Sequence, residues 1–147
     1  MPPSAIIDTN VLVAGVITRN PRSASAAIVD ALLAGRLTHF ASQESLSEVR
    51  NVLQVLRSYH HFTDDEIEEF CLGLELNSSL LQSTVTVSPT VPRDPTDAKW
   101  LALAKQSDAD YLLTNDRRHL LRLRHFGRTQ IVTPAMFVQA LRKADDA

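Results

Sequence analysis

The sequence predicts an α/β fold, a three-layer α/β/α sandwich around a central, mainly parallel sheet of about five strands. Short apolar runs rich in β-branched residues alternate with longer stretches of helical periodicity along the chain. This alternation implies βαβ crossovers and a sheet that is covered on both faces. The 147 residues contain no repeat, linker or low-complexity segment, so we expect one domain spanning residues 1–147, with a single core.

The first quarter of the chain contains two predicted strands and two predicted helices. Ala5–Ile7 is an apolar run with two isoleucines and is typical of a short buried strand. Asn10–Ile17 fits a short helix. Ser23–Ala34 is rich in alanine and fits a second helix, which Gly35 ends. Leu37–Ala41 is the second predicted strand.

Capping residues mark the next two helices. Ser42 precedes a helix that we expect to reach about Leu56. The capping-box pattern of Thr63-Asp64-Asp65-Glu66 begins another helix. Its inward-facing residues are expected to be Ile67, Phe70, Leu74 and Leu81. Thr84–Val87 is the third predicted strand.

The last third of the chain repeats the alternation. A proline-rich loop leads to a helix that begins near Pro95 and ends at about Ser107. Strands are predicted at Asp110–Thr114 and Gln130–Val132. Thr133-Pro134 begins the final helix, with proline at its tolerated first position.

The composition excludes several classes of protein. The hydrophobic fraction of 44% and the charged fraction of 22% are those of an ordinary globular chain. No apolar run approaches the ~18 residues that a membrane span needs, and no signal-peptide pattern is seen. We therefore expect a soluble, cytoplasmic protein that does not bind membranes. Cys71 is the only cysteine and is expected to be a small buried hydrophobe.

Two acids are predicted at the carboxyl edge of the sheet, where open α/β folds bind ligands. Asp8 directly follows the first strand, and Asp116 follows the strand that ends at Thr114. Each has a simpler interpretation, because aspartate also caps turns and helices. Asp108 and Asp110 lie before and at the start of the same strand, so they are expected at the opposite edge.

Two further acids lie where helical periodicity calls for an apolar residue. Projection of the helix after Ser42 at 100° per residue places Glu48 between Val52 and Val55 on the inward arc. The same projection after Pro95 places Asp97 on an inward arc, which also contains Trp100, Leu101, Leu103 and Ala104.

Both of these acids have structural alternatives. Glu48 can reach water from the margin of its helix, and Asp97 can complement the dipole of its helix from the first turn. Asp94 is assigned to capping that helix. An ionised carboxylate turned toward a core is costly unless it is paired or bound to a metal, so Glu48 and Asp97 remain candidates for chemistry.

Together, Asp8, Glu48, Asp97 and Asp116 predict a site for a divalent cation. Four carboxylates at one edge of a sheet repel one another unless a cation holds them. Oxygen donors without histidine or cysteine favour Mg²⁺ or Mn²⁺ over zinc. Such a site suits hydrolysis of phosphodiester bonds, in which a metal ion activates water.

Arginines are concentrated directly after Asp116. The net charge of −2 gives no overall signature of nucleic-acid binding. However, twelve positions without an acid contain Arg117, Arg118, Arg122, Arg124 and Arg128. Arginine binds phosphate through two N–H groups at once, which lysine cannot do. Arg117 and Arg118 are therefore candidates for substrate binding. An ordinary solvated surface is the competing interpretation.

The acids and their surroundings resemble the PIN domain family, and in particular its VapC-like toxins of toxin–antitoxin systems. The matching segments, in chain order, are Ile6–Leu12, Ser45–Val49, Asp94–Ala104, Ala109–Asp116 and Ile131–Pro134 with Phe137. No single segment is highly specific, but their order along nearly the whole chain favours this family.

The resemblance implies a Mg²⁺- or Mn²⁺-dependent ribonuclease that cleaves RNA. Asp8, Glu48, Asp97 and Asp116 would take the acidic positions of the family, as metal ligands and as groups that position the attacking water. Thr114 would support the last acid, and Asn10 matches the polar residue after the first. The resemblance also implies a homodimer and a small antitoxin protein as partner. The arginine-rich run lies outside the motifs, and it would steer RNA by phosphate contacts.

Two alternatives from other classes remain open. A PIN-like module could bind RNA or protein without turnover, although the intact set of acids argues against it. A phospho-acceptor signalling domain also uses aspartates at strand ends. It would need a paired acid beside the first strand and a lysine after a late strand, and Thr133-Pro134 follows the last predicted strand instead.

Overall fold

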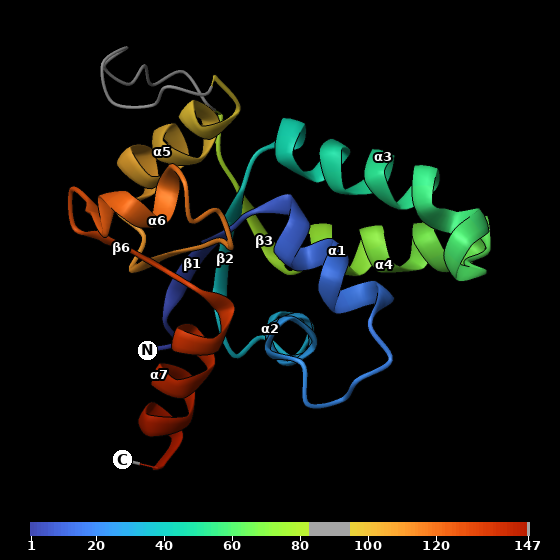
Figure 1. The fold of residues 1–147 in the computed structure, drawn as a ribbon, viewed down its shortest axis with the longest axis horizontal. Coiled ribbons are helices and arrows are strands. Elements are labelled where there is room, and N and C mark those ends of the chain that lie inside the picture. Colours follow the sequence, from blue (N-terminus) through green and yellow to red (C-terminus); the bar gives the residue numbers. More distant parts are fainter. Residues whose placement is uncertain (83–94, 147) are drawn as a thin grey trace.

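One six-stranded sheet runs through the described part of the molecule (Figure 1). The computed structural model describes residues 1–82 and 95–146, and for 95–97 the backbone alone. The strand order is β3-β2-β1-β4-β6-β5. The strands are β1 (Ser4–Ile7), β2 (Thr38–Ala41), β3 (Ser78–Leu80), β4 (Tyr111–Leu113), β5 (His125–Phe126) and β6 (Thr129–Val132). Neighbouring strands are parallel except β5 and β6, which pair antiparallel.

Seven helices in the described ranges surround this sheet. They are α1 (Thr9–Ile17), α2 (Ala24–Leu33), α3 (Gln43–His60), α4 (Asp64–Leu76), α5 (Pro95–Ser107), α6 (Leu120–Leu123) and α7 (Pro134–Asp146). Helices α1, α2, α3, α4 and α7 share one hydrophobic cluster, whereas α5 and α6 contribute to another. The predicted α/β/α sandwich with a mainly parallel sheet is confirmed.

Side-chain alternation along β1 separates the two cores. Ala5 and Ile7 pack into the cluster under α1, α2, α3, α4 and α7. Ile6 packs into the cluster under α5, together with Trp100 and Leu112. All three β1 residues are no more than 2% exposed. A strand buried on both faces needs apolar residues at every position, which is why the run Ala5–Ile7 is continuous rather than alternating.

The expected helix from Asp64 to Leu81 is too long, and this prediction is wrong. Helix α4 ends at Leu76, and Ser78–Leu80 form β3 instead. Asn77 caps the helix, and its side-chain amide donates to the Gly73 carbonyl. The backbone groups of Ser78–Leu80 then form hydrogen bonds with β2. This pairing stabilises the strand more than the helical spacing of apolar residues up to Leu81 would stabilise a longer helix. The predicted strand Thr84–Val87 lies outside the described residues.

Other boundaries shift by a few residues. Helix α3 continues past Leu56 to His60, and His61 ends it with a left-handed backbone conformation. Val55, which we predicted on the inward arc, is 71% exposed. The arginine-rich run is not a plain loop, since it forms α6 and the first strand of the β5–β6 hairpin.

His39 is a buried histidine at the centre of β2. The side chain is 2% exposed, and its Nδ1 lies 2.7 Å from Ser78 Oγ. Because the Ser78 hydroxyl gives its proton to the Leu74 carbonyl, Nδ1 must be the donor to Ser78. Burial lowers the pKa of His39 from the usual 6.5 to about 4. The ring is therefore neutral at pH 7.

We expect His39 to make stability depend on pH. Between pH 6.5 and pH 4 the unfolded chain binds this proton and the native chain does not, so acid favours unfolding. Lowering the pH from 7 to 5 should cost about 2 kcal/mol of unfolding free energy through His39 alone. Urea unfolding at the two pH values measures this loss. A His39→Gln variant should lack it, and an equally steep fall in that variant would contradict the assignment.

Two further expectations concern the described residues. Cys71 is buried and unpaired, as predicted from its apolar neighbours. Among the described helices, none is both long and apolar enough to cross a membrane.

Candidate active site at the carboxyl edge of the sheet

The central strands β1 and β4 end side by side, and this position defines the candidate site. The chain moves from β1 to β2 and β3 on one side, and later to β4 and β6 on the other. The carboxyl ends of β1 and β4 are therefore a topological switch point, where α/β folds bind ligands. The Asp8 amide donates to Leu113 O at 2.9 Å, and the Thr114 amide donates to Val132 O at 3.1 Å. Asp8 and Thr114 thus extend neighbouring strands at the same edge.

Asp8 is a partly buried carboxylate fixed by its neighbour. Thr114 donates its hydroxyl proton to Asp8 Oδ2 at 2.8 Å, and Thr114 itself is fully buried. Asp8 is also the N-cap of α1, and its Oδ1 accepts a long 3.5 Å bond from the Asn10 amide. Burial raises the pKa of Asp8 and nearby Glu48 raises it further, whereas Thr114, the Asn10 amide and Lys99 lower it. Burial and Glu48 thus make the charged form of Asp8 less favourable, and a cation at this edge would offset that cost.

Glu48 belongs to the same electrostatic group. It lies in the second turn of α3, whose start is fixed by a capping box between Ser42 and Ser45. Its side chain is 36% exposed and forms an ion pair with Lys99 of α5. Glu48 thus turns toward the carboxyl edge rather than into the core. It acts on the pKa of Asp8 from a different helix.

Lys99 is the site residue that the sequence reasoning missed. Its Nζ contacts Glu48 Oε2 and lies 5.0 Å from the centre of the Trp100 ring. Its side chain is only 23% exposed. At 100° per residue, Lys99 stands about 40° from Leu103, at the margin of the inward arc. The sequence did contain a signal for Lys99: it is a basic residue at the margin of an inward arc, in a chain whose Asp8 and Glu48 needed a positive partner.

Asp116 lies at the predicted edge but has a structural task there. Its amide donates to Thr114 Oγ1 at 3.0 Å, so Thr114 connects the loops that carry Asp8 and Asp116. Its carboxylate accepts backbone bonds of 3.2–3.4 Å from residues 118–120. His119 Nδ1 lies 3.6 Å from Asp116 Oδ2. The capping alternative is therefore realised, and a ligand role for Asp116 stays a prediction.

The remaining predicted site residues differ in how far the structure describes them. Asp97 lies in the first turn of α5, but its side chain and the whole of Asp94 are outside the description. Asn10 is exposed in the first turn of α1. Arg117 and Arg118 are exposed in the loop after β4, next to Asp116.

The donor set at this edge fits a hard divalent cation. The described side chains that converge are the carboxylates of Asp8 and Glu48, and Lys99 supplies positive charge between α3 and α5. The buried hydroxyl of Thr9 also has no hydrogen-bond partner among the described residues. No group of three or more His, Cys, Asp or Glu side chains is placed to hold a metal in that part of the chain. A complete site would need Asp97, whose side chain is not described.

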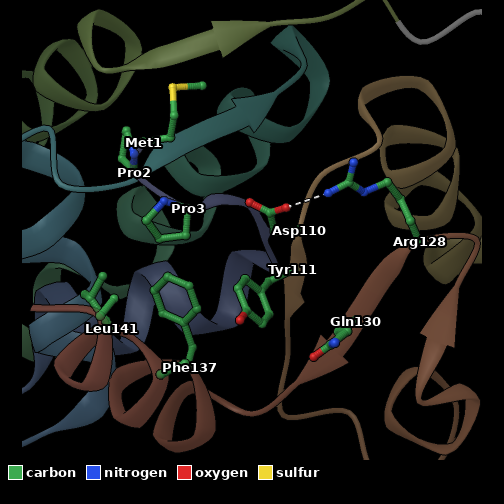
Figure 2. Close-up of a pocket in the computed structure, with 11 residues that line it drawn as sticks. Met1, Pro2, Pro3, Asp110, Tyr111, Arg128, Gln130, Phe137 and Leu141 are labelled. Carbon is green, nitrogen blue, oxygen red and sulfur yellow. Dashed lines mark hydrogen bonds and ion pairs between the residues drawn. The ribbon is translucent and has the colours of Figure 1, made fainter. Parts of the chain in front are cut away.

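A pocket of about 410 Å³ lies at the opposite edge of the sheet. Figure 2 shows Pro3 beside Phe137 and Leu141 of α7, and Met1 and Pro2 also line the pocket. Asp110 accepts bonds there from the amide and hydroxyl of Ser4 and pairs with Arg128 at 2.9 Å. This confirms that Asp110 belongs to the amino edge, away from Asp8.

Comparison with known proteins assigns the family. Residues 4–118 match the PIN domain, a family of nucleases, and this match covers well over half of the chain. It begins at β1 and ends in the loop after β4, so it contains Asp8, Glu48, Asp97 and Asp116. A search of curated proteins found no match. On the family match and the α/β/α architecture, the chain belongs to the PIN domain family.

Proposed function

We propose that this protein is a metal-dependent endoribonuclease that hydrolyses phosphodiester bonds in RNA. The observation that carries the proposal is the Asp8 carboxylate, which Thr114 fixes at the switch point and which faces Glu48 across the carboxyl edge. The family supplies the reaction class, since PIN domains are nucleases. RNA as the substrate rests on the resemblance to VapC-like toxins.

Each residue of the site has a proposed task. Asp8, Glu48, Asp97 and Asp116 would hold Mg²⁺ or Mn²⁺ and orient the attacking water. A bound divalent cation would lower the pKa of that water and stabilise charge on the phosphoryl oxygens. Thr114 keeps Asp8 in one rotamer and positions the Asp116 loop through its two hydrogen bonds.

Lys99 has a separate task in this proposal. Its ammonium reduces the repulsion between Asp8 and Glu48, because it contacts Glu48 and lowers the pKa of Asp8. It also lies on the Trp100 face, which limits the directions its side chain takes. Asn10 and Arg117 face solvent beside the acids and would contact the phosphates of the substrate.

The biological setting is also a proposal. The resemblance to VapC-like proteins supports a toxin whose partner is a small antitoxin that covers the acidic edge, and a homodimer as the assembly. Coexpression of the protein with the product of a short neighbouring reading frame tests this: copurification and loss of RNA cleavage are expected. Cleavage that persists in the copurified complex would contradict the antitoxin proposal.

Metal removal tests the enzymatic proposal directly. We expect cleavage of a mixed single-stranded RNA pool to stop in excess EDTA and to return on addition of Mn²⁺ or Mg²⁺. The metal should also raise the unfolding temperature, since it binds the folded protein and not the unfolded chain. Cleavage that continues in EDTA would refute the metal requirement. Intact RNA under every metal condition would favour the alternative, a PIN-like binding module without turnover.

A further inference from the structure

A groove of about 980 Å³ lies beside the β5–β6 hairpin, and arginines line it. Arg117 comes from the loop after β4, Arg122 from α6, Arg124 from the residue after α6, and Arg128 from the β5–β6 turn. We call these four residues and their concave surface the arginine groove. Only Arg117 falls within the PIN match, which ends at residue 118. The other three arginines lie outside the matched segment.

The strand register orients the groove relative to the candidate site. Strand β6 runs parallel to β4, so Thr133 at the far end of β6 lies at the same edge as Thr114. Thr133 and Arg117 both line the groove. Arg128 stands at the other end, beside Asp110 at the amino edge. The groove follows β6 for roughly 10 Å, at about 3.3 Å per residue, and opens at the edge that carries Asp8.

Within the described ranges, three of the four arginines of the groove form no ion pair. Arg128 is paired with Asp110 at 2.9 Å. Arg117, Arg122 and Arg124 are exposed, and no acid of the described ranges 1–82 and 98–146 forms an ion pair with them. Unpaired guanidinium groups are free to bind phosphate in a bidentate manner.

The backbone of Arg124 is strained where its side chain joins the groove. Its φ is +62°, a region that favours glycine. The Arg124 carbonyl accepts a 2.8 Å bond from the Ile131 amide, which holds this conformation against β6. A residue other than glycine that is held at such a φ is a candidate for function. Glycine would adopt this backbone conformation without strain, so the presence of arginine here is consistent with a functional need for its positive charge.

We propose that the arginine groove binds the phosphate backbone of single-stranded RNA and leads the strand to the acids at the carboxyl edge. The direction toward the acids rests on the proposed function, whereas the binding itself does not. A positively charged groove that follows a backbone is the usual way to bind single strands. RNA is favoured over an acidic protein because the groove opens at the candidate site of a nuclease family, whose substrate is a phosphodiester chain.

The test measures RNA binding without cleavage. Fluorescence anisotropy of a labelled 12-nucleotide oligouridylate is followed in EDTA over a range of KCl concentrations. The groove variant is Arg122→Gln/Arg124→Gly. Loss of two phosphate contacts should weaken binding about 10- to 30-fold at 0.1 M salt and reduce the slope of log K against log salt by about 1.4. Unchanged affinity and slope would overturn the proposal.

Two controls separate charge from folding. Arg19→Gln/Arg22→Gly removes two exposed arginines from the loop between α1 and α2, remote from α6 in Figure 1, and should bind as tightly as the wild type. Arg124→Gly alone should not lower the unfolding temperature, since glycine adopts the positive φ without strain. If it does, Arg122→Gln alone, with an expected slope change of about 0.7, decides the question.

The remaining outcomes distinguish the occupant and the two proposals. Polyglutamate of equal charge that competes as well as RNA would overturn the RNA assignment in favour of an acidic protein. Binding in EDTA requires no turnover, so a protein that binds in the groove but never cleaves RNA refutes only the proposed function. If the protein cleaves RNA but the groove variant binds RNA as tightly as the wild type, only the proposal about the arginine groove is refuted.

Discussion

Asp8→Asn should reduce RNA cleavage by at least about 100-fold while leaving the protein folded. Metal sites lose about 10- to 100-fold when even a supporting residue is changed, and Asp8 is proposed as a ligand itself. The asparagine oxygen can still accept the hydrogen bond of Thr114, so the local geometry should persist. Steady cleavage rates of the purified variant on single-stranded RNA measure the loss.

Stability gives an independent measure of the same substitution. The charge of Asp8 is partly buried and faces Glu48, which together raise its pKa. Neutralising it should therefore leave the unfolding temperature without metal unchanged or higher. The stabilisation that Mn²⁺ gives the wild type should shrink in the variant, because its affinity for the metal falls. Full cleavage activity in Asp8→Asn would refute the proposed site.

Asp110→Asn is the matched control for Asp8→Asn. Asp110 lies at the amino edge, where it accepts bonds from Ser4 and pairs with Arg128. The same chemical change there should lower stability while leaving RNA cleavage near the wild-type rate. An equal loss of activity in both variants would show that general damage, rather than the site, explains the effect of Asp8→Asn.

Gly15→Ala should cause one of the largest losses of stability for so small a change. A Cβ at Gly15 would lie 2.5 Å from Ser25 O and 2.6 Å from Val29 Cγ2. The first contact is with the backbone of α2, so the two helices must separate. Such overpacking costs about 1–3 kcal/mol, or about 2–4 °C per kcal/mol in unfolding temperature. Because α1 begins next to Asp8, we also expect slower cleavage.

Gly73→Ala provides the control with the opposite sign. It lies inside α4, and an added Cβ would meet only Leu33 Cδ2 at 3.3 Å. Leu33 is 40% exposed and can move aside. Alanine in the interior of a helix should then stabilise by about 0.5–1 kcal/mol. Thermal unfolding of both variants tests the pair, and a destabilised Gly73→Ala with an unaffected Gly15→Ala would contradict the packing described for α1 and α2.

The sequence predicted the parts of the fold that depend on local patterns. Short runs rich in apolar residues identified β1, β2, β4 and β6, and capping residues identified the starts of α3 and α4. Strand β3 was missed because Ser78–Leu80 have no apolar run of their own, and pairing with β2 makes them a strand. Strand β5 has only two residues and exists because it pairs with β6.

The candidate site, like the fold, was predictable only where it depends on local sequence. The sequence placed Asp8 at a strand end because that prediction needs only an apolar run followed by a carboxylate. It could not reveal that Thr114, 106 residues later, donates to Asp8. That bond exists because β4 crosses over to pair with β1.

Tertiary structure alone decided which charges meet. Glu48 and Lys99 are 51 residues apart on α3 and α5, and their ion pair depends on how these helices flank the sheet. Asp116 became the cap of its own loop because the amides of residues 118–120 turn back toward it. Local patterns therefore determined most of the helices, four of the six strands and the edge that carries Asp8. The crossovers of the chain decided the rest, because they bring side chains from distant elements within hydrogen-bonding distance.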